Sequence, residues 1–145
     1  MAEQEYDRLS LAQEQLETAI SLFIDAKNYT CAITLAGAAE EVFGKELTRR
    51  GGKCTLEIWY DSIAETHRLL HNAELVKTSF IDGENRARNA LKHLESAKGP
   101  TITLDLEECA CWMLVRALQN GKGVGVVFDR EGEFEEWFWA NVVGE

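Results

Sequence analysis

The stretch Leu35-Ala-Gly-Ala-Ala-Glu-Glu41-Val-Phe-Gly-Lys45 lies in the most apolar part of this 145-residue chain. Around it, apolar residues recur at spacings of three and four over residues 29–50, which predicts one face of an α-helix. Gly37 and Gly44 form a small-residue strip beside that face, where a neighbouring helix can approach closely. Glu40 lies between the two glycines at the edge of the face. The residues expected on the buried face are Ala32, Leu35, Ala36, Ala39, Val42, Phe43 and Leu47.

Three other segments have the same helical spacing. Residues 5–27 place apolar side chains three and four apart, with Glu, Gln and Asp on the outer side. Residues 106–120 form a further predicted helix, and Asp105 with Glu108 resembles a capping arrangement at its start. The third predicted helix covers residues 56–72. Its expected buried residues are Ile58, Trp59, Ile63, Leu69 and Leu70.

Turn residues divide the second half of the chain. Asp82-Gly83 marks a boundary, where Asp82 is a candidate N-cap for a helix that Lys98-Gly99-Pro100 ends. After the helix over residues 106–120, glycines interrupt the chain, and residues 124–128 are a candidate short strand. Residues 134–143 are then expected to form an aromatic helix, packed into the core or, as the alternative, exposed at a dimer interface.

These segments predict an all-α fold, an antiparallel up-and-down bundle of four main helices plus a short C-terminal extension. The length fits one domain over residues 1–145, with the core over residues 5–120 and an appendage over residues 121–145. No apolar run approaches the length of a membrane span, and the N-terminus is acidic rather than basic and then apolar. A cytoplasmic protein without membrane contact is therefore expected.

The charge balance limits the kinds of partner. The chain carries 15 Lys and Arg against 25 Asp and Glu, a net charge of −10. Proteins that bind nucleic acid without sequence preference use a broad basic face, because phosphate neutralisation supplies most of their affinity. Any contact with RNA must therefore be local, or a partner must supply basic surface.

The candidate chemistry gathers on residues 82–96, which contain two arginines, an asparagine and a histidine. On a helix, Arg86, Asn89 and His93 share one stripe, whereas Arg88 lies about 140° away from His93, at the flank. An arginine that holds a phosphate oxygen and a histidine that exchanges a proton suit phosphoryl chemistry. Glu40 is a candidate counter-charge, which gives a five-residue polar seam between two helices. The alternative is a solvated helix face with ordinary charge pairs.

Arg88-Asn89 followed by His93 resembles the R-x4-H motif of the HEPN superfamily, the higher eukaryotes and prokaryotes nucleotide-binding domains. The glycine- and alanine-rich helix around Glu40 is also similar to the second helix of HEPN proteins that carry an acidic residue there. The resemblance covers about residues 5–120 and implies a helical domain, in many members a metal-independent RNase. In such an RNase Arg88 and His93 would be the catalytic pair, and Asn89 would orient the phosphate or the histidine. Arg86 and Glu40 would complete the substrate site.

The resemblance also implies partners. HEPN motifs of two subunits usually face each other, so a homodimer with a composite cleft is expected. Many members are toxins neutralised by an antitoxin, often a small nucleotidyltransferase, whereas others have lost catalysis and only bind a nucleotide or a protein.

No cofactor or metal is expected. His67 and His71 are four residues apart, with Glu74 three further on, and a half-exposed polar face explains them better than a metal site. The glycines of Gly121-Lys-Gly-Val-Gly125 lack the spacing of a phosphate-binding loop and are read as a helix stop.

Overall fold

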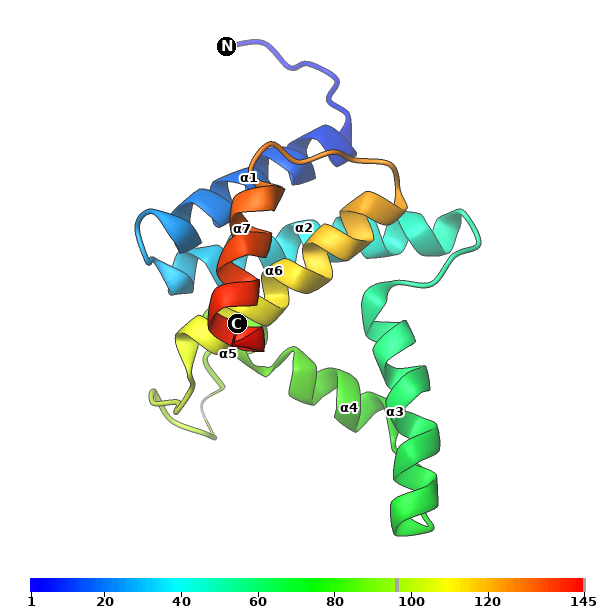
Figure 1. The fold of residues 1–145 in the computed structure, drawn as a ribbon. Coiled ribbons are helices and arrows are strands. Elements are labelled where there is room, and N and C mark those ends of the chain that lie inside the picture. The colour runs from blue at the N-terminus through cyan, green and yellow to red at the C-terminus, as the bar shows by residue number, and fades with distance from the viewer. Residues whose placement is uncertain (96, 145) are drawn as a thin grey trace.

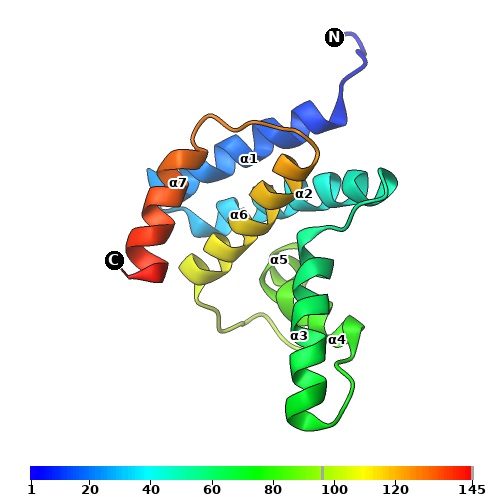
Figure 2. The same cartoon turned by 45° about the vertical axis from the view of Figure 1, so that its right-hand side comes forward.

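A computed structural model describes residues 1–95 and 97–144, and every regular element in these residues is helical (Figure 1, Figure 2). The predicted all-α class is therefore confirmed, and the strand predicted over residues 124–128 is wrong. No helix in the described part of the chain is both long and apolar enough to cross a lipid bilayer. In chain order the elements are α1 (Arg8–Ile24), α2 (Tyr29–Arg49), α3 (Thr55–His71), α4 (Lys77–Glu84), α5 (Arg86–Lys92), α6 (Leu106–Gly123), α7 (Glu131–Phe138) and the π-helical turn η1 (Trp139–Val143).

The core is built by α1, α2 and α6, and α2 packs against both of the others. These are the helices predicted over residues 5–27, 29–50 and 106–120, whose apolar residues repeat at helical spacing. Asp105 caps α6 as predicted, because its carboxylate accepts a hydrogen bond from the backbone N–H of Glu108 at 3.0 Å. Several side chains of the three helices are fully buried, namely Leu16, Ile20, Ile33, Phe43 and Leu114.

The small-residue strip on α2 serves close packing, as the sequence suggests. A Cβ atom added at Gly44 would lie 3.0 Å from the side-chain nitrogen of Asn120 on α6. One added at Gly37 would lie 2.7 Å from Cδ of Arg88 on α5. Both glycines therefore admit polar side chains from neighbouring helices against the backbone of α2.

The helices α3 and α4 extend away from this core as an arm, which both views show (Figure 1, Figure 2). The only buried residues of α3 are Thr55 and Leu56 at its start. Tyr60 packs against Phe80 of α4, with ring centroids 5.7 Å apart. Trp59 is half-buried and contacts Trp112 of α6, with ring centroids 6.0 Å apart. The expected burial of the other apolar residues of α3 is wrong, because no other element of the described chain covers its far end. The exposed fractions are 50% for Ile58, 46% for Ile63 and 74% each for Leu69 and Leu70.

The helix expected to run to Lys98 is interrupted twice. Asp82 is not an N-cap, because it lies inside α4. The helix is interrupted at Asn85, and the chain becomes helical again as α5. The helix α5 then ends at Lys92, and His93 has the extended backbone angles φ −133° and ψ 130°. Ser96, which falls within the predicted helix, lies outside the described residues.

The C-terminal segment folds back onto α1. Arg130 forms ion pairs with Asp25 at the end of α1 and with Glu133, each at 2.6 Å. Phe134 is buried against Phe23, with ring centroids 5.6 Å apart. The aromatic helix is thus part of the core through Phe134, whereas Trp139 at its end remains 60% exposed.

Candidate functional site

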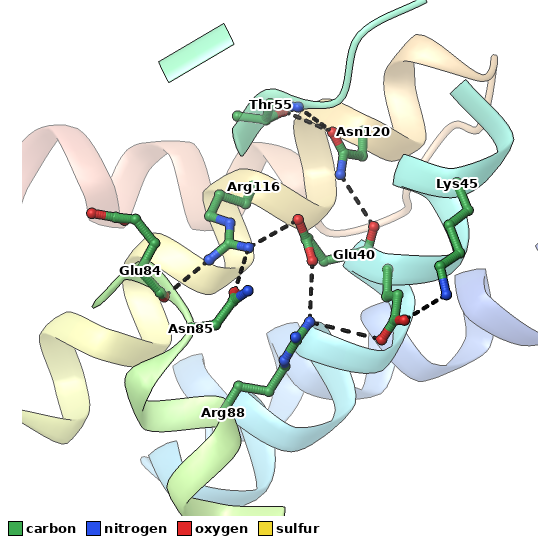
Figure 3. Close-up of polar contacts among 9 residues, drawn as sticks. Glu40, Lys45, Thr55, Glu84, Asn85, Arg88, Arg116 and Asn120 are labelled. Carbon is green, nitrogen blue, oxygen red and sulfur yellow. Dashed lines mark hydrogen bonds and ion pairs between the residues drawn. The ribbon is translucent and has the colours of Figure 1, made fainter. Parts of the chain in front are cut away.

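A buried arginine joins three helices in the centre of the molecule (Figure 3). Arg116 of α6 is 1% exposed and donates hydrogen bonds from Nη2 to Oε1 of Glu40 at 3.0 Å and to Oδ1 of Asn85 at 2.8 Å. Its Nη1 donates to the carbonyl of Glu84 at 3.1 Å. Glu40 and Asn85 are buried as well, so the desolvated guanidinium is paired with a carboxylate and polar oxygens. These contacts hold the break between α4 and α5 against α2 and α6.

A second buried side chain extends the same network to α3. Asn120 of α6 is completely buried, and its Nδ2 donates to the carbonyl of Glu40 at 3.1 Å. Its Oδ1 accepts hydrogen bonds from the backbone N–H and the hydroxyl of Thr55, both at 2.8 Å (Figure 3). The first turn of the arm is therefore anchored to the core by one amide group.

Arg88 belongs to this interior cluster. Its Nη1 lies 3.6 Å from Oε2 of Glu40 and 3.8 Å from Oε2 of Glu41, and its side chain is only 15% exposed (Figure 3). The aliphatic part crosses α2 at Gly37, where a side chain would collide with it. Its Nε is buried without a hydrogen-bond partner in the described residues. The arginine of the R-x4-H motif thus faces α2.

The histidine of the motif lies elsewhere. His93 lines an open pocket of about 550 Å³ together with Arg86, Asn89 and Lys98. Arg86, His93 and Lys98 are exposed, whereas Asn89 is half-buried. The backbone N–H of His93 still donates to the carbonyl of Asn89 at 2.9 Å, which keeps the histidine next to the end of α5. Residues 99–103 also line the pocket.

The five expected site residues therefore form two groups. Arg86, Asn89 and His93 line one pocket, which matches their shared stripe, although His93 reaches it from an extended segment. Arg88 and Glu40 pair behind α5 and do not line that pocket. The prediction of a single polar seam between two helices is wrong. Arg86 and Arg88 are two residues apart on α5, so their side chains lie on nearly opposite sides of the helix.

Carboxylates border both groups. Lys98 forms an ion pair with Glu95 at 2.8 Å, and the hydrogen bond from Lys98 lowers the pKa of Glu95, to which the charge of His93 also contributes. The pKa of Glu41 is also lowered, mainly by its hydrogen bond from Lys45 and less by the charges of Arg88 and Lys92. The pocket is thus mixed in charge, with cations that an entering anion could share.

The alternative metal site gains no support. The rings of His67 and His71 lie against each other, with centroids 4.6 Å apart, and Nδ1 of His67 is 3.0 Å from the carbonyl of Ala73. Glu74 follows the end of α3 and so leaves the helical stripe. Within the described residues, no three His, Cys, Asp or Glu side chains are placed to hold a metal ion together.

Sequence reasoning missed Arg116, Asn85 and Asn120. Arg116 and Asn120 lie on the stripe of α6 that also carries the buried Met113 and Ala117. A lone arginine on an apolar stripe is a recognisable signal for a buried ion pair, and Glu40 on the apolar face of α2 is its natural partner. Asn85 gives no such signal, because its role depends on a contact with a residue far along the chain.

Comparison with models of known protein families, with curated protein sequences and with solved structures gives no significant match to this chain. The candidate site is therefore interpreted from its own geometry.

Proposed function

We propose that the open pocket binds an RNA phosphodiester, and that the protein is a HEPN-like, metal-independent endoribonuclease of the cytoplasm. The observation that supports this is the meeting of Arg86, Asn89, His93 and Lys98 around one pocket in an otherwise acidic chain. Its volume of about 550 Å³ lies within the range of small-molecule sites, so a nucleotide unit fits. Arg86 and Lys98 supply local cations to the pocket, which Asp82 and Glu95 also line, so a bound phosphate would share Lys98 with Glu95.

The reaction follows from the groups at hand. The 2′-hydroxyl oxygen of the RNA attacks the adjacent phosphorus, His93 takes up the hydroxyl proton, and the bond to the 5′-oxygen breaks. The leaving 5′-oxygen takes a proton from water, and His93 later releases the proton that it took up to solvent. The products are a 2′,3′-cyclic phosphate and a 5′-hydroxyl. Negative charge builds on the phosphoryl oxygens, which Arg86 and Lys98 stabilise from the pocket. Asn89 orients the phosphate.

The resemblance assigns the phosphate to Arg88, whereas the geometry favours Arg86. Arg88 would have to leave Glu40 and Glu41 to reach the pocket, at the cost of its ion pair with the buried Glu40. In the proposal Arg88 supports the site from behind, by joining α5 to α2.

The wider arrangement belongs to the same proposal. The helices α1, α2, α5 and α6 would be the four main helices of an antiparallel HEPN-like bundle. Two copies would bring their His93 residues to a composite cleft, and a nucleotidyltransferase-type antitoxin would be the partner of a toxin-type member.

RNA cleavage by the purified protein tests the proposal. We expect a single-stranded RNA to be cut in the presence of EDTA, and His93→Ala to abolish the cleavage with at least about a 100-fold loss of rate. Arg86→Ala should reduce the rate as strongly as Arg88→Ala or more. Because His93 and Arg86 are exposed, both variants should remain folded, which circular dichroism checks. Cleavage that EDTA stops, or that His93→Ala leaves unchanged, contradicts the proposal.

A non-catalytic module is the second candidate, and the pairing of Arg88 with Glu40 and Glu41 favours it. In a binding module Arg88 would stabilise the fold through these ion pairs, and the pocket alone would bind the ligand. In that case the RNA or a nucleoside phosphate binds, Arg86→Ala weakens the binding, and no cleavage product appears.

A further inference from the structure

An aromatic groove lies between the start of α3, α6 and the C-terminal elements α7 and η1. Three of the four tryptophans of the chain line it, namely Trp59 of α3, Trp112 of α6 and Trp139 of η1. Trp112 is 39% exposed and Trp139 is 60% exposed. Tryptophan is mostly buried in folded proteins, so two exposed rings around one hollow indicate a binding surface. The volume of the groove is about 490 Å³, which is within the range of small-molecule sites.

The rings along the groove stand nearly perpendicular to their neighbours. The planes of Trp59 and Trp112 meet at 86° with centroids 6.0 Å apart, and those of Trp112 and Phe138 meet at 83° with centroids 5.7 Å apart. The walls of the groove therefore form corners, in which a bound group can contact more than one ring. The face of an aromatic ring carries partial negative charge and attracts a cation within about 6 Å of its centre. Val115 and Leu118 of α6 add aliphatic surface to the lining.

The charged side chains of the groove favour the same kind of ligand. Among the described residues that line it, the charged ones are Glu131, Glu135 and Lys122. Nζ of Lys122 lies 2.6 Å from Oε1 of Glu131 and 3.9 Å from Oε1 of Glu135. The pKa of Lys122 is raised, mainly by its hydrogen bond to Glu131 and less by the charges of the two glutamates. Two carboxylates against one lysine leave a net negative charge, which repels phosphates and attracts cations.

We propose that the groove binds a small organic cation, an alkylated ammonium group that carries an apolar substituent. The ammonium group lies against the rings of Trp112 and Trp139 beside Glu135, and the substituent packs on Val115 and Leu118. An alkylated ammonium group suits this lining better than a metal ion, because it buries apolar surface while it keeps its charge. The groove and the pocket around His93 have no lining residue in common, so the inference does not rest on the proposed function.

Titration with benzyltrimethylammonium, followed by NMR of the tryptophan indole N–H groups, tests the proposal. The four tryptophans give four separate indole signals. Those of Trp59, Trp112 and Trp139 should shift with one common dissociation constant, on the order of 0.1–1 mM for an open groove. The signal of Trp137 is the internal control and should not move, because its ring packs against Phe23 at 4.6 Å and does not line the groove. The absence of any shift up to about 10 mM overturns the inference.

A matched pair of probes separates charge from shape. Choline and its neutral analogue, in which a carbon atom replaces the nitrogen, have the same shape, but only choline is positively charged. Choline should bind at least about tenfold more tightly than the neutral analogue, and benzenesulfonate, an anion, should not bind. If the neutral analogue binds as tightly as choline, the groove is a purely apolar site and the inference is wrong.

Two substitutions test the residues that would recognise the cation. Trp139→Leu keeps apolar surface but removes an aromatic face, and it should weaken benzyltrimethylammonium binding about fivefold or more, whereas Trp139→Phe should retain most of the affinity. Glu135→Gln should weaken binding about threefold or more at low salt, with a smaller difference from wild type as salt is added.

Glu136→Gln is the matched control for Glu135→Gln, because it removes the same charge from the next residue, which is exposed and does not line the groove. Glu136→Gln should bind benzyltrimethylammonium as wild type does. All substituted positions are exposed, so circular dichroism should show the wild-type helix content in each variant. Binding that Trp139→Leu or Glu135→Gln leaves unchanged also overturns the inference.

Discussion

Arg88 and Arg86 are two residues apart on α5 and lie in opposite surroundings. Arg88 is 15% exposed and pairs with Glu40 inside the molecule, whereas Arg86 is exposed and lines an open pocket with His93. The interior cluster of Glu40, Arg88 and Arg116 connects α2, α5 and α6. The pocket is lined by Asp82 of α4, by α5 and by the segment after α5. The spacing of residues along one helix therefore does not show which residue packs the helix against its neighbours and which one faces a pocket.

The difference has an energetic consequence. A charge in the interior has lost its hydration and depends on its partners, so removing one partner leaves the other buried and uncompensated. A charge in the pocket keeps most of its hydration, and its removal leaves the folded state nearly unchanged. Stability and ligand binding should therefore separate cleanly between the two groups.

The largest expected effect is the loss of Arg116. Arg116→Ala leaves Glu40 and Asn85 buried without their donor, and we expect the free energy of unfolding to fall by about 3–5 kcal/mol. Urea denaturation followed by circular dichroism measures this change. Arg86→Ala is the matched control, an arginine of the same chain that should alter the free energy of unfolding by about 0.5 kcal/mol or less.

A double variant sharpens the result. Replacing Arg116 and Glu40 together by Met removes both charges from the interior, although Arg88 then loses its partner. If the double variant is as stable as wild type, the ion pair contributes specificity rather than stability. If Arg116→Ala and Arg86→Ala lowered the free energy of unfolding equally, the interior cluster and the pocket would not differ in their contribution to stability.

A smaller effect is expected at the glycine that Arg88 crosses. Ala normally stabilises a helix by about 1 kcal/mol relative to Gly. At Gly37, however, the new Cβ would lie 2.7 Å from Cδ and 3.0 Å from Cγ of Arg88, whose guanidinium is held by Glu40. We expect Gly37→Ala to lower the free energy of unfolding by about 1–2 kcal/mol through this overpacking.

Gly132 in α7 is the matched control for that substitution, because nothing lies within 4 Å of an added Cβ there. Gly132→Ala should raise the free energy of unfolding by a few tenths to about 1 kcal/mol. Thermal unfolding of the two variants side by side reports the opposite signs. A stabilising Gly37→Ala would mean that Arg88 moves aside at little cost.

The predictable part of the fold comprises the helices whose apolar faces are complete. The helices α1, α2 and α6 were predicted because their apolar residues recur every three and four positions, and Asp105 with Glu108 marked the start of α6. The break at Asn85 was not predicted, since the sequence around Gly83 marks a boundary but not the hydrogen bond from Arg116 that fixes its place. The amphipathic pattern of α3 correctly predicts a helix, but the apolar side that it predicts to be buried is exposed.

The candidate site shows the same division. The shared stripe of Arg86, Asn89 and His93 follows from helical periodicity, and these residues do line one pocket. The inward position of Arg88 depends on the space left by Gly37 and on the carboxylates of Glu40 and Glu41, which come from a helix distant in the sequence. The roles of these residues in RNA binding and cleavage remain to be tested by the variants proposed above.

The smallest expected effect lies at Glu41, where the interior cluster reaches solvent. Its pKa is lowered from the usual value of 4.5 by the hydrogen bond from Lys45 and, to a lesser degree, by the charges of Arg88 and Lys92. A lowered pKa in the folded state means that the unfolded chain binds the proton more readily. The stabilisation is therefore complete above about pH 4.5 and is lost as the pH falls through the lower, folded-state value. Because Glu41 is 43% exposed, the contribution should not exceed about 1 kcal/mol.

Glu41→Gln isolates this contribution. The free energy of unfolding of wild type should exceed that of the variant at neutral pH, and the difference should shrink as the pH falls below 4.5 and as salt is added. Glu3→Gln, at an exposed position before α1, provides the control for the loss of one carboxylate. A difference that persists unchanged at low pH would show that Glu41 acts through packing. Glu40 would then be the carboxylate that stabilises Arg88 electrostatically, and Glu41 would not belong to the interior cluster.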